Sequence, residues 1–321
     1  MNTSEARKKK LSHALSPKLF GSLKREVGDC AYAPIVQAVR KDIDLDMEFR
    51  GNYLNVYYRG NSILKLEEDG GFEIHENIRK HLNGLLVASD DNEKLTRLIT
   101  KTHVQGYVDS IPQLKAAVTK QRSDSRDSLE REYEQLIIRA NNRESRINSE
   151  YVILDRQYAY GLDDSNEKNS EQWDLVAVKW PRKNRGDKNP KGYLALIEVK
   201  YDDNPDIKNL ASQIEGYHSH LRQNMKSICD DMKEVLNQKL DLDLVCRTER
   251  RKDQLRKLTL DESLTSAEII IYLVDYNPNS TLFKMAKPEL EKLPFKIRVA
   301  HGGFAMWDQY CKPLDQVAVT K

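Results

Sequence analysis

The spacing of apolar residues along the first third of the chain predicts a mixture of short helices and strands. Apolar and polar residues alternate over residues 52–58 and 62–68, and the Gly60-Asn61 turn between them predicts a β-hairpin. Ser16-Pro17 is typical of a helix start. Helices are expected over residues 19–27, 35–42, 93–102 and 111–121, and a further strand over 70–76. Residues 1–122 therefore indicate a small α+β domain.

The pattern changes after a polar stretch at residues 121–128, which we interpret as a domain boundary. Apolar residues at 129, 133, 136, 137 and 140 have helical spacing. Strands are expected over residues 151–161, 173–180, 193–201, 268–276 and 295–303, with a long helix over 206–240 and a basic helix over 247–258. This order predicts an α/β domain over residues 123–321, with a central mixed sheet flanked by helices.

Composition removes several classes of protein from consideration. No stretch approaches the roughly 20 apolar residues of a membrane helix, and no apolar run follows the basic N-terminus, so a cytoplasmic protein without membrane contact is expected. The four cysteines are scattered and the histidines form no metal-binding pair, which argues against a disulfide framework or a zinc site. No phosphate-binding glycine loop is present. The net charge of +2 neither requires nor excludes nucleic acid.

Three charged residues stand at the ends of two predicted neighbouring strands. Asp174 begins one strand, and Glu198 and Lys200 lie in the next. Two residues apart in a strand, Glu198 and Lys200 project from the same face, while Val199 points into the core. Carboxylates bind Mg²⁺ and a nearby lysine can position a water, which is the chemistry that phosphodiester hydrolysis requires. The carbonyl group of Val199 is a possible further ligand.

Asp174 followed by Glu198-Val199-Lys200 resembles the signature of the PD-(D/E)XK, or restriction-endonuclease-like, nuclease superfamily. Gln213 and Tyr217, at positions i and i+4 of the following helix, resemble the QxxxY motif of the RecB-like branch. The resemblance covers roughly residues 130–220 and two later strands, and it departs from the family in having Trp173 before the aspartate and a long insertion before Glu198.

The resemblance implies a restriction-endonuclease-like core and a metal-dependent deoxyribonuclease. Asp174 and Glu198 would bind Mg²⁺, for which Mn²⁺ could substitute, and Lys200 would orient and activate the water. Gln213 and Tyr217 would order Lys200, the metal or the phosphate. The family also implies a glutamate from the preceding helix, for which Glu132 is our choice and Glu130 and Glu134 are close competitors. Such nucleases serve restriction, defence against phage, or DNA repair.

Basic residues between the two strands are candidates for contacts with the DNA backbone, although a solvated turn is the simpler interpretation. They are Arg182, Lys183, Arg185, Lys188 and Lys191. Residues 1–122 could supply target recognition, a partner surface or a dimer contact. The alternatives are a nuclease fold that binds nucleic acid without cutting it, and a nuclease that a regulatory partner protein releases.

Overall fold

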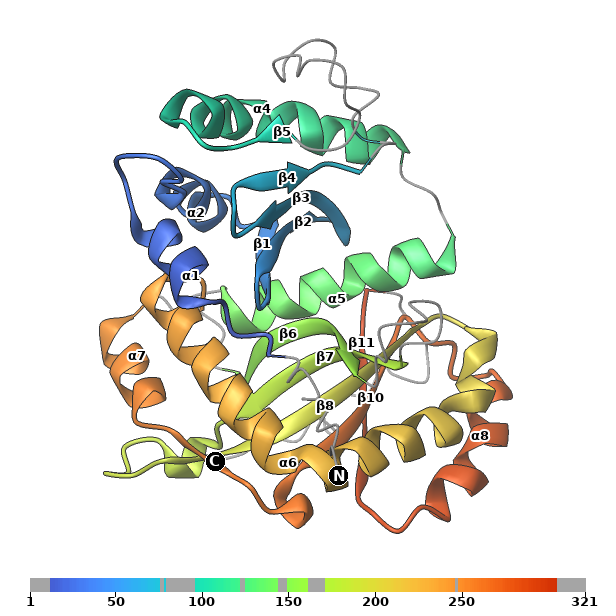
Figure 1. Cartoon of the computed structure of the whole chain (residues 1–321). Helices are drawn as coiled ribbons and strands as arrows, with labels where there is room; N and C mark the ends of the chain where they lie inside the picture. Colours follow the sequence, from blue (N-terminus) through green and yellow to red (C-terminus); the bar gives the residue numbers. More distant parts are fainter. Residues whose placement is uncertain are drawn as a thin grey trace, which may run out of the picture.

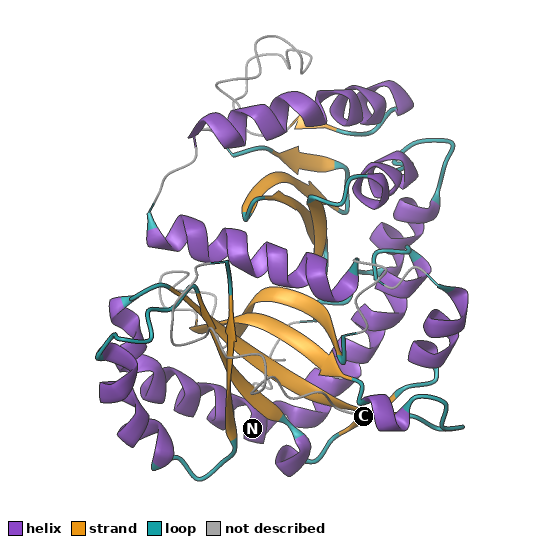
Figure 2. Ribbon diagram, turned by 180° about the vertical axis from the view of Figure 1, so that it is seen from behind, coloured by secondary structure: helices purple, strands orange, loops and turns teal. Residues whose placement is uncertain are grey.

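A computed structural model describes residues 12–75, 78, 96–121, 125–143, 149–160, 171–245 and 248–304, and shows a mixed α/β architecture with two sheets (Figure 1). The first sheet has the strand order β1-β2-β3-β4-β5, and the second has the order β11-β10-β8-β7-β6. Helix α5 (Arg126–Asn142) lies between the two sheets, as both views show (Figures 1 and 2).

The first sheet is antiparallel throughout, and in the described part of the chain helices α1, α2 and α4 accompany it. Its elements are α1 (Pro17–Lys24), α2 (Ala33–Lys41), β1 (Leu45–Arg50), β2 (Tyr53–Tyr58), β3 (Asn61–Glu67), β4 (Gly71–Glu73), β5 (Thr96–Arg97) and α4 (Lys101–Gln121). The predicted hairpin is confirmed as β2–β3. Its turn needs Gly60, which has a φ of +77°, because a Cβ atom there would come within 2.7 Å of the Arg131 backbone in α5.

The structure corrects the sequence prediction at two places in this part. The helix expected over residues 93–102 is wrong at Thr96 and Arg97, which pair with Phe72 and Gly71 as β5; residues 93–95 lie outside the described residues. Strand β1 was not predicted, although apolar and polar residues alternate along it. Its polar residues do not face solvent: Glu48 is fully buried and Asp46 is nearly so.

The second sheet is mixed, as the order of elements predicted. Strands β6, β7 and β8 are antiparallel neighbours, whereas β8, β10 and β11 run parallel. The elements are β6 (Tyr151–Tyr160), β7 (Glu171–Lys179), η2 (Arg182–Asn184), β8 (Lys191–Tyr201), η3 (Pro205–Asn209), α6 (Leu210–Asp241), α7 (Glu249–Arg256), β9 (Thr259–Asp261), η4 (Leu264–Ser266), β10 (Glu268–Val274), α8 (Leu282–Glu291) and β11 (Ile297–Gly302).

Helices cover both faces of this mixed sheet. On one face, Ile137 and Ile138 of α5 pack against apolar residues of β6, β7, β8 and β10. On the other face, α6 contributes a row of buried apolar residues to a larger cluster. That cluster continues without interruption into α1, α2 and the first sheet, so the two parts of the chain share hydrophobic core. Among the described residues, no helix combines the length and apolar character that a bilayer crossing requires.

Buried polar contacts also join the first part of the chain to the second. The Lys239 ammonium group of α6 lies 2.8 Å from Glu48 Oε2 of β1, and both side chains are buried. The Asp231 carboxylate of α6 accepts hydrogen bonds from the backbone N–H groups of His13 and Ala14. These contacts order the segment before α1 against α6, because a buried polar group without a partner is costly.

Candidate active site

The predicted carboxylates lie where strands β7 and β8 separate. The pairing of the two strands ends at Leu175 and Ile197, one residue before Asp174 and Glu198 would face each other. Beyond this pair, the contact with β8 is made by the Asp174 side chain and no longer by the backbone of β7. The Oδ2 atom of Asp174 accepts a 2.8 Å hydrogen bond from the Val199 N–H. The separation therefore opens a polar position inside an otherwise apolar sheet.

Glu198 and Lys200 are both buried, with exposed fractions of 2% and 4%. The Lys200 Nζ atom lies 2.6 Å from Glu198 Oε1. The hydroxyl group of Tyr217, from α6, donates to Glu198 Oε2 and lies 2.9 Å from the carbonyl oxygen of Gln172. Both oxygens of Glu198 thus have protein partners, and strands β7 and β8 and helix α6 meet at one carboxylate.

The described contacts bring Glu130, and not our first choice Glu132, to this cluster. Glu130 Oε1 lies 3.7 Å from Lys200 Nζ, and Glu130 Oε2 accepts hydrogen bonds from the Tyr201 N–H and the Asn204 amide. Glu132 instead forms a 2.8 Å salt bridge with Arg59, in the hairpin turn of the first sheet. These contacts favour Glu130 over Glu132 as the helix ligand.

The reason lies in the two-sided packing of α5. Glu134 is one helical turn beyond Glu130 on the same face, and its carboxylate is paired with the buried Arg156 of β6 at 2.7 Å. Glu132 projects from the opposite side, toward the first sheet. Apolar spacing marks a buried helix face, but it does not say which of two sheets that face meets, so the sequence left three glutamates open.

The electrostatics of the cluster follow from placing several acids around one buried ammonium group. Burial and the negative charge of Glu198 raise the pKa of Asp174 well above its usual value, against the opposing effect of Lys200. Burial likewise raises the pKa of Glu130. For Lys200, burial lowers the pKa, but the charges of Glu198, Asp174 and Glu130 outweigh it and the pKa is raised. Lys200 is accordingly a protonated donor in this arrangement.

Ring packing fixes the position of Asp174. The preceding residue, Trp173, is fully buried and stacks on Tyr158 of β6 with ring centroids 4.9 Å apart. Its edge meets Tyr217 at 6.0 Å and His220 at 5.5 Å, both from α6. Trp173 connects β6, β7 and α6 beside the carboxylate.

The donor set is compatible with a hard divalent cation, although no cluster of three or more histidine, cysteine, aspartate or glutamate side chains within the described ranges is arranged to hold a metal. Mg²⁺ needs only one or two carboxylates, because water and substrate phosphates complete its shell. Asp174 and Glu198 come from adjacent strands, and the Oε1 atom of Gln213, one turn before Tyr217, is buried with no hydrogen-bond donor in the described part of the chain. An oxygen in that state fits a cation or a substrate donor.

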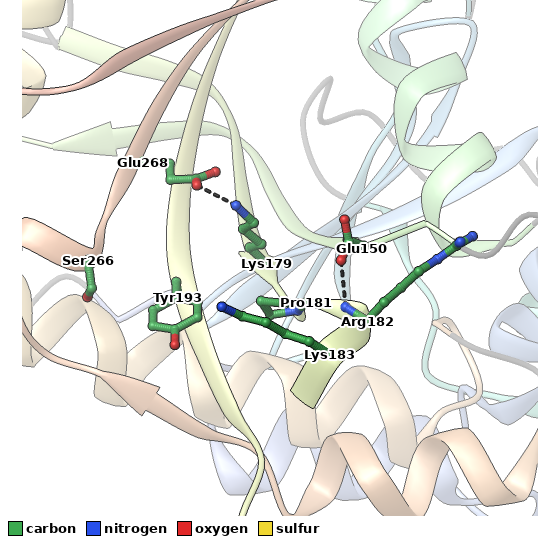
Figure 3. A pocket seen from close by; sticks show the side chains of 8 residues that line it. All are labelled: Glu150, Lys179, Pro181, Arg182, Lys183, Tyr193, Ser266 and Glu268. Carbon is green, nitrogen blue, oxygen red and sulfur yellow. Dashed lines mark hydrogen bonds and ion pairs between the residues drawn. The ribbon is translucent and has the colours of Figure 1, made fainter. Parts of the chain in front are cut away.

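The basic residues between β7 and β8 lie at the other end of the sheet. Seven residues of β8 separate Lys191 from Glu198, which corresponds to about 23 Å. Figure 3 shows Lys183 pointing toward Tyr193 in a pocket that Lys179, Glu268 and Ser266 also line, while the Arg182 side chain points away. Lys188 and Lys191 are exposed. The loop is therefore not adjacent to the carboxylates.

Arg185, in the same loop, is held by contacts within the protein. Its guanidinium group donates to the carbonyl oxygens of Ser149 at 2.6 Å and Trp180 at 3.3 Å, and it lies 4.6 Å above the Trp180 ring. Arg251 of α7 lies 5.7 Å from the same ring and also donates to Ser149. The basic loop and the basic helix therefore meet at Trp180.

The role of Tyr217 in holding Glu198 gives a first testable prediction. Replacing Tyr217 by Phe leaves a buried carboxylate oxygen without its donor, which is expected to lower the free energy of unfolding by about 1–3 kcal/mol. Urea denaturation measures this change. The matched control is Tyr53→Phe in β2, a half-buried tyrosine whose ring packs under Lys65, for which a change below about 0.5 kcal/mol is expected. Equal losses in both variants would contradict the contact.

Comparison with known proteins adds no further information: no family model, no curated protein and no solved structure matches the chain.

Proposed function

We propose that the protein is a metal-dependent nuclease of the PD-(D/E)XK class that hydrolyses phosphodiester bonds in DNA. One observation carries the proposal: Asp174, Glu198 and Lys200 converge where β7 and β8 separate. Two further contacts support it, from Tyr217 of α6 and Glu130 of α5, the two helices that cover the sheet. Burying charged groups costs free energy, so a protein that keeps several of them together has a reason for doing so. A cluster of this kind is typical of catalytic sites.

The mechanism assigns each residue a task. Asp174, Glu198 and Glu130 would hold Mg²⁺ or Mn²⁺, which offsets charge on the phosphate when bound. Lys200 remains protonated, so its ammonium group would orient the attacking water and neutralise a phosphate oxygen, and would not accept the proton. Tyr217 keeps the Glu198 carboxylate oriented. Gln213 supplies a buried acceptor for the water or the substrate.

The test is cleavage of supercoiled plasmid and of single-stranded DNA in Mg²⁺ or Mn²⁺, with Lys200→Ala compared to wild type. We expect the variant to lose about 100-fold or more of the rate, because it lacks the only cation in contact with Glu198 among the described residues. Lys287→Ala, which removes an exposed lysine of α8, is the matched control and should retain activity. Equal cleavage by wild type and Lys200→Ala would refute the assignment of the site.

A partner-gated nuclease is the second candidate, and the contacts of Glu198 favour it specifically. Both of its oxygens are engaged by Lys200 and Tyr217, so a cation bound at Asp174 can also use Glu198 only after one of these contacts is released or shared. A regulatory protein that shifts α6 would supply this change. The distinguishing result is Mn²⁺ binding in calorimetry without DNA cleavage, together with the loss of that binding in Asp174→Ala.

A further inference from the structure

Three aromatic rings lie beside the carboxylate cluster and take no part in the proposed chemistry. Tyr133 of α5 and Tyr201, the last residue of β8, are stacked with centroids 5.1 Å apart and an interplanar angle of 20°. Phe304, just after β11, lies 6.4 Å from Tyr133 at 32°. We call these three residues the aromatic shelf. Tyr133 and Tyr201 also pack against the apolar cluster under α5, so they have a structural role as well.

Phe304 is the unusual member, since 77% of its surface is exposed. Most large apolar side chains of a folded chain are buried, and exposed ones that gather with other rings mark binding surfaces. Its backbone is nevertheless held firmly: the Phe304 N–H donates to Asp275 Oδ1 at 2.5 Å, and the same carboxylate accepts from the Tyr133 hydroxyl. Asp275 therefore fixes two of the three rings relative to each other.

The backbone conformation of Gly303, between β11 and Phe304, determines where the Phe304 ring lies. Gly303 has a φ of +116°, and a Cβ atom there would come within 2.0 Å of Asp275 Oδ1. Only glycine permits the backbone to approach Asp275 so closely. The position of the exposed ring is thus fixed by the turn at Gly303 and by the Asp275 carboxylate. A surface side chain that binds nothing does not need to be fixed in this way.

Two of the three shelf residues lie on elements that also carry residues of the carboxylate cluster, α5 and β8. Tyr133 lies three residues after Glu130 in α5, on a neighbouring part of the same helix face. Tyr201 directly follows Lys200 and its ring lies on the α5 face of the sheet, while its N–H donates to the Glu130 carboxylate at 3.1 Å. Because Glu130 Oε1 also lies 3.7 Å from Lys200 Nζ, a nucleotide next to a phosphate bound at the Glu130 end of the cluster would extend toward the shelf.

On this basis, and resting on the proposed nuclease function, we propose that the aromatic shelf stacks an unpaired base next to the scissile phosphate. The substrate would be single-stranded DNA or a frayed or overhanging end. Rings bind bases through their faces without regard to sequence, whereas a base inside a duplex has both faces covered by its neighbours. An intact blunt duplex offers only its terminal base pair to an exposed ring such as Phe304.

The acidic surroundings favour a base over other occupants. Asp275 and Glu130 lie beside the shelf, and no cationic side chain is described in contact with Phe304. A lipid surface or an acidic peptide would be repelled there. The neutral face of a base, on a strand whose phosphates are neutralised by Lys200 and a cation, meets no such penalty.

The test uses Phe304→Ala, Phe304→Trp and the control Met285→Ala, an apolar residue of α8 that is 65% exposed and is not part of the shelf. Binding of a single-stranded oligonucleotide carrying 2-aminopurine is measured by fluorescence with Ca²⁺ in place of Mg²⁺, so that a divalent cation is present, and the oligonucleotide is checked by gel to be uncut. We expect Phe304→Ala to raise the Kd about 5- to 100-fold, which corresponds to the loss of one stacked base, with less quenching of 2-aminopurine. Phe304→Trp should retain affinity, and Met285→Ala and blunt-duplex binding should be unchanged.

The outcomes separate the shelf from the nuclease function. Unchanged or tighter binding by Phe304→Ala overturns the shelf, whether or not the protein cuts DNA. A change of oligomeric state in Phe304→Ala, measured by sedimentation, with unchanged oligonucleotide binding also overturns it and identifies a contact between copies of the chain. If wild type stacks the base but does not cleave in Mg²⁺, the proposed role of the shelf is retained and only catalysis by the isolated chain is refuted.

Discussion

On the proposed nuclease function, replacing Asp174 by Asn is expected to abolish DNA cleavage and, at the same time, to stabilise the protein in the absence of a metal. Asn keeps the shape of the side chain and can still accept the Val199 N–H through its amide oxygen. It removes the negative charge that burial and Glu198 oppose. A cleavage rate lower by about 100-fold or more is expected with the loss of this ligand. We expect a gain of about 1–2 kcal/mol in the free energy of unfolding, as for other functional sites that hold strained charges.

The pH dependence of this gain follows from the direction of the pKa shift. The pKa of Asp174 is higher in the folded protein than in the unfolded chain, where it is about 3.9, so ionisation costs more in the fold. Below pH of about 4 both states are protonated and the charge contributes nothing. As pH rises through the folded pKa the wild type loses stability, so the gain in Asp174→Asn should grow toward neutral pH.

Chemical denaturation of both proteins at several pH values, in the presence of EDTA, measures this difference. The control is Asp206→Asn, an exposed aspartate in η3, for which a change within about 0.5 kcal/mol is expected at every pH. If Asp174→Asn proved less stable than wild type at neutral pH, the carboxylate would not be under electrostatic strain, and the argument for a cation that relieves it would lose its support.

The parts of the site that the sequence predicted are those set by local geometry. Glu198 and Lys200 share a face because they are two residues apart in a strand, and Tyr217 reaches Glu198 because α6 follows β8 directly and packs on the same face. Charged residues in an otherwise apolar strand were visible from the pattern alone. The alternation of side chains along a strand decides on which face each residue projects, so the sequence was enough to predict these contacts.

The parts that it missed depend on how distant segments pack. The preference for Glu130 over Glu132 arises because α5 lies between two sheets. The apolar spacing of a helix does not show which of its sides meets which sheet. The distance of the basic loop from the carboxylates follows from the antiparallel pairing of β7 and β8, because Asp174 lies near the start of β7 and Glu198 near the end of β8, away from the turn that joins them. The aromatic shelf joins residues 133, 201 and 304, whose proximity follows only from the completed fold.

The contact between Lys239 and Glu48 gives the largest expected effect on stability. Replacing Lys239 by Ala leaves the fully buried carboxyl group of Glu48 without its cation. Breaking a buried pair in this way costs about 3–5 kcal/mol, because the remaining charge is uncompensated. The exposed pair Lys24–Asp241, which also links the first part of the chain to α6, is the matched control. Lys24→Ala should cost no more than about 1 kcal/mol.

The size of the Lys239→Ala effect should depend on pH, which distinguishes a charge effect from lost packing. Burial already raises the pKa of Glu48 well above its usual value, although Lys239 opposes the shift, and removing the lysine raises it further. Protonation of Glu48 then relieves the penalty, so the destabilisation measured by urea unfolding should shrink as pH falls from 8 to 5. A penalty independent of pH would indicate lost packing of the lysine chain.

A double variant separates these contributions further and tests how the two parts of the chain fold. Glu48→Gln with Lys239→Met replaces the pair by neutral groups of similar size, and it should recover most of the stability lost in Lys239→Ala. Because the hydrophobic cluster runs through both parts, wild type and double variant should unfold in one transition by circular dichroism and by tryptophan fluorescence. Two separated transitions in Lys239→Ala alone would show that this pair couples the first sheet to the sheet that holds Asp174 and Glu198.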